Sequence, residues 1–330
     1  MAGEVSVFGS ISPRVGVHAS QLAIATARRK QIISRTAVHE PIPKKKGMQV
    51  DFRVWDHLAP ATRPIQGSQT PSAGQHSIQD ISATLEIFGN WLPLPKYVED
   101  TIEDRTMAKA SDVLGYNIGD TYETLDFLTL RQGANSYYAG GKTARTQVVG
   151  AFDLNDLRRC VADLESDDVP MITDLVSPSI KIGTTPIEEA YLVFVHSHLD
   201  QTVRDLAGFV PRAKYAQDTK VLDGELGSCE NMRFIRWNYA KPWLAAGDTI
   251  ATGFRGTSNT DVYPVFILGK EAWGTSELKG TEFNKVLIAN AKPTAGDELG
   301  QRGSAGWLGY HVSTILQEDH MIRLETAAKK

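Results

Sequence analysis

Two short stretches with strictly alternating polarity, separated by a long polar segment, constrain the fold more than any other feature of this chain. The alternating apolar positions are Met48, Val50, Phe52 and Val54 in the first stretch and Ile81, Ala83, Leu85 and Ile87 in the second. This period of two predicts half-buried β-strands. About 20 residues rich in Pro, Gly, Ser, Thr and Gln join them, which is unusual inside a compact domain. We therefore predict a long hairpin that projects from the body.

An isolated hairpin is only marginally stable in water, so its apolar face needs a surface to lie on. Nothing next to the hairpin in the sequence offers one, and an exposed apolar face of this kind is typical of a contact with a partner. The residues that we expect to make this contact are Val50, Phe52, Val54, Trp55, Ile81, Leu85 and Ile87.

The charge of the chain is unevenly distributed. The formal net charge is −4, but the first 79 residues hold ten Lys and Arg and only four Asp and Glu. The two basic clusters are Arg28, Arg29 and Lys30, and Lys44, Lys45 and Lys46. Such a segment either is a solvated arm or contacts nucleic acid or another acidic partner. No sequence-specific nucleic-acid motif accompanies the clusters, so any contact with phosphates would be electrostatic.

Three stretches favour helices. Residues 18–38 contain no Gly or Pro and carry a weak apolar stripe. Residues 96–132 contain no Pro and predict a long helix, with a break possible near Gly115 and a C-cap at Gly133. Its predicted buried face consists of Leu114, Ile118, Tyr122, Leu125 and Leu128. Asp153 predicts the N-cap of a further helix that runs to Leu164.

Beyond residue 187 the chain alternates between strand and helix patterns. The expected strands are 191–196, 232–237, 262–268, a segment around Phe283, Val286 and Ile288, and 321–325, with a short helix over 199–206. The order lacks the regular β–α alternation of a doubly wound sheet. The sequence thus predicts a mixed α+β fold.

The search for catalytic and metal-binding motifs favours no enzyme class. Gly140-Gly141-Lys142-Thr143 lacks the first glycine of a phosphate-binding loop and follows a helix, so a turn is the better interpretation. His196, His198 and Asp200 lack a third ligand at a characteristic spacing, and we expect them to cap the helix that follows.

The two cysteines also give no indication of chemistry. Cys160 lies within a predicted amphipathic helix and is expected to be a core residue. Glu230 beside Cys229 would raise the pKa of that thiol rather than activate it. We expect no cofactor and no enzymatic activity. The longest apolar runs are too short to span a membrane, and the N-terminus has no signal-peptide pattern, so a membrane contact is not expected.

The order of parts, together with several local motifs, resembles a known family. The motifs are WLPLPK (91–96), TYETL (121–125), GANSYYAGG (133–141), DGELG (223–227) with RFI (233–235), YPVFILGKEAWG (263–274) and LGQRGSAGW (299–307). They resemble the major capsid proteins of tailed bacteriophages, in the branch of short-tailed phages that carry a virion RNA polymerase. That family has the Johnson fold, which herpesvirus capsids share. The resemblance covers residues 90 to 325, and its last two motifs are the most specific.

The resemblance implies a division of the chain into the parts of the Johnson fold. The expected parts are an N-terminal arm (1–46), an extended β-hairpin loop (47–95), a peripheral domain with the spine helix (96–168), an axial domain (169–290) and returning peripheral strands (291–330). The hairpin would then lie across a neighbouring subunit, with its apolar face on the neighbour's long helix. The basic arm would lie on the inner surface of the shell.

The implied function is self-assembly into hexamers and pentamers of an icosahedral shell around double-stranded DNA. The implied partners are many copies of the chain itself, a separate scaffold protein, a portal, a decoration protein and packaged DNA, in a virion assembled in the bacterial host cytoplasm. Because 47–95 contains no lysine, the lysine–asparagine crosslink of some members is not expected. The alternatives left open are a cytosolic α+β enzyme with a dispersed active site and another phage structural protein, such as a decoration or scaffold protein.

Overall fold

The computed structural model describes residues 31–43, 45–55, 77–97, 106–173, 189–215, 223–279, 284–289 and 296–330, together with positions 58, 60, 62, 67, 74 and 293. The helices are α3 (Thr106–Leu130), α4 (Leu154–Ser166) and α5 (Asp200–Arg204), with 3-10 turns η2 (Ile33–Thr36), η3 (Ala139–Gly141), η4 (Arg145–Gln147), η5 (Ser197–Leu199), η6 (Arg212–Lys214) and η7 (Glu318–His320). None of the helices in this described part is long and apolar enough to span a lipid bilayer.

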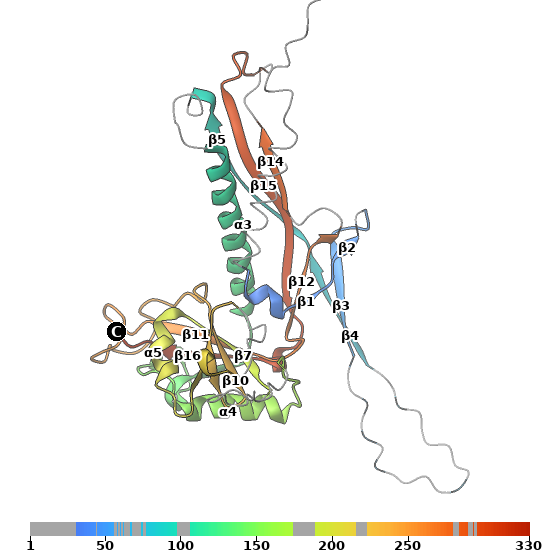
Figure 1. Cartoon of the computed structure of the whole chain (residues 1–330). Coiled ribbons are helices and arrows are strands. Elements are labelled where there is room, and N and C mark those ends of the chain that lie inside the picture. Colours follow the sequence, from blue (N-terminus) through green and yellow to red (C-terminus); the bar gives the residue numbers. More distant parts are fainter. Residues whose placement is uncertain are drawn as a thin grey trace, which may run out of the picture.

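The strands alternate with these helices in an α+β order. They are β1 (Val38–His39), β2 (Ile42–Pro43), β3 (Gln49–Trp55), β4 (Ile78–Thr84), β5 (Glu86–Pro95), β6 (Ser136–Tyr138), β7 (Tyr191–Val195), β8 (Val210–Pro211), β9 (Glu225–Cys229), β10 (Met232–Arg236), β11 (Val262–Leu268), β12 (Trp273–Ser276), β13 (Leu278–Lys279), β14 (Asn284–Ala289), β15 (Arg302–Ile315) and β16 (Met321–Ala327). Figure 1 shows an elongated upper part, a rounded lower part and a hairpin on one side.

The elongated part consists of a long helix lying along a narrow sheet. β15 is the central strand and pairs antiparallel with β5 on one side and β14 on the other. α3 lies on one face of this sheet, where Leu114, Ile118 and Tyr122 pack against Ala305 and Trp307 of β15. Because the opposite face of β5 and β15 has no helix on it (Figure 1), its apolar side chains Ile87, Trp91 and Leu308 stay exposed.

The predicted long helix forms, with three corrections. α3 runs without a break through Gly115 and Gly119. Leu128 is exposed rather than buried, because beyond Tyr122 the helix buries Phe127 instead, in the core of the rounded part.

The third correction concerns the end of this helix. Gly133 does not adopt the left-handed conformation of a glycine C-cap. The guanidinium of Arg323 donates instead to the carbonyl oxygens of Arg131 and Gly133, at 2.9 Å to the latter. A Cβ on Gly133 would lie 2.7 Å from Met321 Cε, so the glycine lets this methionine of β16 pack closely against the chain after α3.

The rounded part is built on a seven-stranded sheet with the order β6-β16-β11-β7-β10-β9-β8. β7 and β10 are parallel neighbours and β11 and β16 antiparallel ones. The central strands are buried along their whole length, which explains why they contain nearly continuous apolar runs. α4 covers one face of the sheet through Leu157, Val161 and Leu164, as the sequence predicted. Asp153 caps α4 in a reciprocal capping box with Asp156.

The sheets do not follow the predicted domain boundaries. Of the peripheral segment 96–168, β6 is a strand of the seven-stranded sheet of the rounded part and α4 packs on that sheet. The returning segment 291–330 is divided, because β15 lies in the elongated sheet and β16 in the rounded one. β14, assigned to the axial segment 169–290, pairs with β15. Each sheet collects strands that are far apart in sequence, which boundaries drawn along the chain cannot reproduce.

The described end of the predicted arm lies on the body. Ile33 is fully buried, β1 pairs in parallel with β12, and β2 pairs in parallel with β13. The predicted helix over 18–38 is therefore wrong for its described residues, which form the short turn η2 and then a strand. Its residues before position 31 lie outside the described part of the chain.

Candidate functional site

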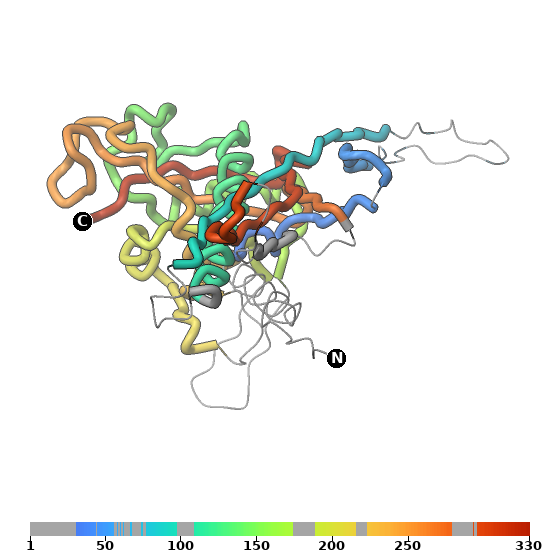
Figure 2. Tube along the Cα trace, turned by 90° about the horizontal axis from the view of Figure 1, so that it is seen from above, coloured from blue at the N-terminus to red at the C-terminus, as the bar shows by residue number. Residues whose placement is uncertain are grey.

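The predicted hairpin exists and has two different faces. β3 and β4 pair antiparallel, with Val50 opposite Ala83, Phe52 opposite Ile81 and Trp55 opposite Ile78. Because successive residues of a strand point to opposite sides, Val50, Phe52 and Val54 share one face and Trp55 lies on the other. Seen from above, the hairpin extends away from the rest of the molecule (Figure 2).

The apolar face of the hairpin is covered by its own chain, which corrects the expectation that a partner must cover it. Phe52 is 3% exposed, and Val50 and Leu85 are buried with it. The side chains that cover them include Ile42, Leu278, Tyr310, Val312 and Leu316. The expectation that Val50, Phe52 and Leu85 are free to contact a neighbour is therefore wrong, since β2, β13 and β15 supply a local core.

The opposite face of the hairpin is polar and ends in two exposed apolar residues. Arg53 forms an ion pair with Asp80 at 2.8 Å, and Ser82 donates to Asp51 at 2.6 Å. At the far end of the described strands, Trp55 is 56% exposed and Ile78, directly opposite it, is 43% exposed. The sequence analysis grouped Trp55 with the apolar residues of the inner face. The alternation of side chains along β3 places it on the outer face instead.

A second exposed apolar surface lies on the side of the elongated sheet that faces away from α3. Trp91 is 67% exposed, and Ile87 and Leu308 are exposed on the same face. Trp91 lies opposite Gly306, where a Cβ would come within 3.1 Å of Trp91 Cβ. The glycine therefore leaves room for the Cβ of Trp91 beside β15. The sequence analysis selected Ile87 but missed Trp91, although a large aromatic residue shortly before two prolines of an edge strand is a usable signal.

The remaining predicted contact and arm residues are only partly placed. Val54 and Ile81 are half-buried on the inner face of the hairpin. Lys45 and Lys46 are exposed at the turn before β3. Arg28, Arg29, Lys30 and Lys44 lie outside the described residues.

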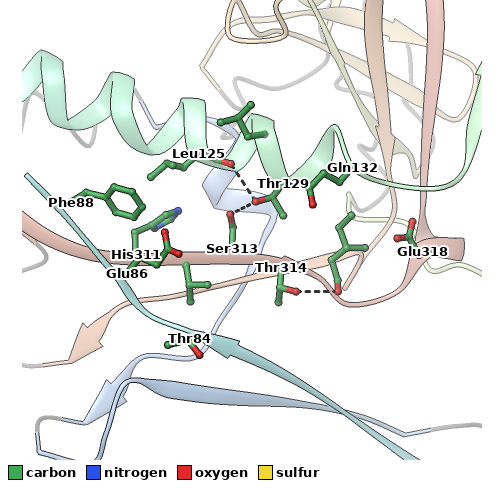
Figure 3. A pocket seen from close by; sticks show the side chains of 13 residues that line it. Thr84, Glu86, Phe88, Leu125, Thr129, Gln132, His311, Ser313, Thr314 and Glu318 are labelled. Atoms are coloured by element: carbon green, nitrogen blue, oxygen red, sulfur yellow. Dashed lines mark hydrogen bonds between the residues drawn. The ribbon is translucent and has the colours of Figure 1, made fainter. Parts of the chain in front are cut away.

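A groove of about 550 Å³ lies between α3, β5 and β15 (Figure 3). Leu125 and Thr129 of α3, Phe88 of β5, and His311 and Ser313 of β15 line it. His311 Nε2 lies 2.8 Å from the buried Asp126 Oδ1, but Ser313 Oγ is bonded to Thr129 Oγ1. A serine nucleophile would need its hydrogen bond to the histidine, so this arrangement is not that of an activated serine.

The motifs rejected from the sequence have structural roles. His196 accepts a hydrogen bond from the backbone N–H of His198 and so caps η5, as expected. Asp200 is paired with Arg236. Burial raises the pKa of Cys160 to about 12, which fits an inert core thiol. Within the described ranges, no group of three or more His, Cys, Asp and Glu side chains is placed to hold a metal ion.

A buried carboxyl joins the arm, the long helix and the rounded part. Glu123 of α3 accepts from the backbone N–H groups of Ile32, at 2.6 Å, and Ile33, at 3.3 Å, and also from the indole N–H of Trp237. Removal from water raises the pKa of Glu123 to about 8, and the nearby Asp126 adds to the increase. The three donors act in the opposite direction but do not compensate for the burial.

This carboxyl predicts that stability falls as the pH rises from about 4.5 to about 8. Between its ordinary pKa of 4.5 and the raised value of about 8, the folded state holds a proton that the unfolded state has released. Stability therefore falls with rising pH in this window, by about 1.4 kcal/mol per pH unit from a group that is fully protonated when folded. Urea denaturation of the soluble subunit should show a lower midpoint at pH 8 than at pH 6.5. Glu123→Gln should remove most of this slope, and an unchanged slope would contradict the assignment.

Comparisons with known proteins place this fold. No protein-family model matches the chain. A major capsid protein of Pseudomonas phage KPP21 is 23% identical over 210 residues, which are 58% of this chain and 53% of that protein. The chain thus aligns with about half the length of this curated relative.

Solved structures of phage heads resemble the chain over nearly its whole length. The capsid of Ralstonia phage GP4 has a TM-score of 0.68 at 12% identity and covers 91% of this chain and 92% of its own. The head of Helicobacter pylori bacteriophage KHP40 has a TM-score of 0.62 at 12% identity, with 90% and 88% covered. The long helix on a narrow sheet, the rounded α+β part and the lateral hairpin are therefore the Johnson fold of tailed-phage capsids.

Proposed function

We propose that this chain is a major capsid protein that assembles into hexamers and pentamers of an icosahedral shell enclosing double-stranded DNA. The observation that carries the proposal is the likeness to phage-head chains over about nine-tenths of both partners. The relative from phage KPP21 is named a major capsid protein. The role is structural, without enzymatic activity or a cofactor.

The exposed apolar residues support contacts between copies. Trp55 and Ile78 at the hairpin end, and Ile87, Trp91 and Leu308 on the sheet, form surfaces that a soluble monomer would leave in water. We propose that the hairpin end lies on a neighbouring subunit, with Val54 and Ile81 at the rim of that contact. A specific interface of this kind needs at least about 1,600 Å² of total buried area, which the long hairpin and sheet face together can supply.

Finer features of the proposal concern the particle. The chain would belong to the branch of short-tailed phages with a virion RNA polymerase, assemble in the bacterial cytoplasm, and work with a separate scaffold, a portal and a decoration protein. The basic residues Lys45 and Lys46, together with the basic cluster at 28–30, would face packaged DNA or scaffold. Such contacts should weaken steeply with salt, since they are electrostatic.

The proposal is tested by imaging the expressed full-length chain. Size-exclusion chromatography followed by negative-stain microscopy should show capsomers, sheets or shells. A small closed oligomer or a monodisperse monomer at high concentration, with and without a co-expressed scaffold, would contradict the proposal.

The absence of lysine between residues 47 and 95 gives a separate prediction. Mature particles boiled in SDS should yield a single band at the subunit mass of 36.2 kDa, because the hairpin has no lysine to form an isopeptide bond. A ladder of covalent multimers would show that another residue forms the crosslink.

A further inference from the structure

Three guanidinium groups gather around one indole at the end of α3. The distances from the ring centroid of Trp243 are 3.8 Å for Arg145 Cζ, 4.8 Å for Arg131 Cζ and 5.9 Å for Arg323 Cζ. We call these four residues and Glu325 the Trp243 cluster. Stacking on an aromatic face holds guanidinium groups in place while leaving N–H donors free in the plane of the group.

The Trp243 cluster carries more positive than negative charge. The fully buried Glu325 accepts two hydrogen bonds from Arg145, at 2.6 and 2.7 Å, and one from Arg323 at 3.0 Å. The guanidinium of Arg323 also donates hydrogen bonds to the carbonyl oxygens of Arg131 and Gly133, just after α3. Arg131 is exposed, and among the described residues no carboxylate pairs with it. One carboxylate thus balances three guanidinium groups.

A groove with the opposite charge lies beside the hairpin. It has a volume of about 470 Å³ and is lined by four exposed acids, Glu40, Asp167, Asp168 and Glu271. Its cationic lining residue Arg53 is already paired with Asp80, and His320 Nδ1 bonds to a backbone carbonyl oxygen. No ion pair to any of the four acids is found within the described part of the chain. We call this the acidic groove.

The position of two of these acids is unfavourable for the subunit alone. Asp167 is the C-cap of α4 and Asp168 follows it, at the negative end of the helix dipole, and the last turn holds no basic residue. Negative charges there oppose the dipole by a few tenths of a kcal/mol each. They therefore add nothing to the stability of the helix, but they would suit a cationic partner.

Trp243 and the acidic groove lie toward opposite ends of the same pair of strands, and the other strand residues of the cluster, Arg323 and Glu325, lie between those ends opposite Phe266 and Pro264. Trp243 bridges to Val262, where β11 begins opposite Ala327, whereas the groove residues Glu271 and His320 lie beyond the other end, where Leu268 faces Met321. Seven strand residues separate these ends, which is about 20 Å. Figures 1 and 2 agree, since the C-terminus and the hairpin lie on opposite sides of the molecule. Within the described part of one copy no ion pair joins Arg131 to any of the four acids, so both surfaces are left for a contact with another copy.

We propose that the Trp243 cluster of one copy docks on the acidic groove of the next copy, so that Arg131 pairs with the carboxylates of Asp167 and its neighbours. The inference rests on the proposed function, because it needs copies that assemble. A contact between two different surfaces of the same chain is heterologous, and such contacts close into rings when the rotation allows it. The exposed Trp55 lines the same groove and adds apolar area to the contact.

The test is a charge reversal on each side, followed by both in the same chain. Arg131→Glu and Asp167→Lys should each lower the fraction of protein in capsomers or shells at least tenfold at fixed concentration and low salt. Asp167→Lys favours the dipole of α4, so an unchanged or higher melting temperature of its subunit will show that the loss is not unfolding. The double variant Arg131→Glu/Asp167→Lys should return to within threefold of the parent.

The control is Arg204→Glu, an exposed arginine on α5 outside both surfaces. Asp167→Lys should not improve assembly of the Arg204→Glu chain. The inference is overturned if the double variant assembles no better than the weaker single variant, or if both single variants assemble like the parent. A parent chain that never assembles contradicts the proposed function instead, so the two failures are distinguishable.

Discussion

Phe52→Asp should detach the hairpin from the body of the isolated subunit. Phe52 is 3% exposed and lies against Gly274, where a Cβ would come within 2.8 Å of its ring. Removing a buried phenylalanine side chain costs about 3–5 kcal/mol, and a buried carboxylate adds to that cost. Hydrogen exchange of the β3 and β4 amides should speed up by at least about 100-fold, whereas the amides of the seven-stranded sheet should change little.

Trp55→Asp is the matched variant on the other face of the same strand. Trp55 is 56% exposed, so the substitution should change subunit stability by no more than about 0.5 kcal/mol. It should nevertheless block shell formation, because a carboxylate would replace an apolar contact between copies. If Phe52→Asp leaves exchange of the hairpin unchanged, the intramolecular core around Phe52 is wrong. Normal shells from Trp55→Asp would exclude the hairpin end from the interface.

The second large effect is expected at Glu325. This carboxylate is fully buried and holds both Arg145 and Arg323, and Arg323 in turn satisfies the last carbonyl groups of α3. Glu325→Ala leaves two guanidinium groups without their carboxylate in a buried setting, which typically costs about 3–5 kcal/mol. Urea denaturation of the subunit, followed by tryptophan fluorescence, will measure the loss.

Glu230→Gln is the control for Glu325→Ala. Glu230 also pairs with an arginine, Arg158, but both side chains are well exposed. Solvent screens such a pair, and its loss should cost less than about 1 kcal/mol. Equal losses in the two variants would show that burial does not set the energy of these ion pairs.

Local signals account for the elements that the sequence predicted well. The capping residue Asp153 and the spacing of Leu157, Val161 and Leu164 determine α4, and the structure confirms each of them. The strands β7, β10, β11 and β16 were also identified from their apolar runs. Strands that are buried on both faces are apolar at most positions, so the run itself is the signal.

The elements that sequence reasoning missed depend on distant partners. β15, the longest of the described strands, was not located from its apolar pattern, because Gly303, Gly306 and Gly309 interrupt it, and only the family resemblance implied returning strands within 291–330. Its strand conformation follows from pairing with β5 and β14, which lie elsewhere in the sequence. Leu128 is exposed for a similar reason. The part of α3 up to Tyr122 packs in the core of the elongated part, whereas Phe127 and Leu130 pack in the core of the rounded part.

The sequence by itself determined that a hairpin forms, that a long helix and a mixed α+β body follow it, and that basic charge gathers at the start of an acidic chain. Only the tertiary structure decided which surfaces are left for a partner. The apolar face of Phe52 is covered by β2, β13 and β15, whereas Trp55, one strand face away, stays exposed. The physical reason is that periodicity assigns side chains to a face, but burial requires a second surface. Apart from Ile42 of β2, that surface comes from β13 and β15, more than 200 positions away in the sequence.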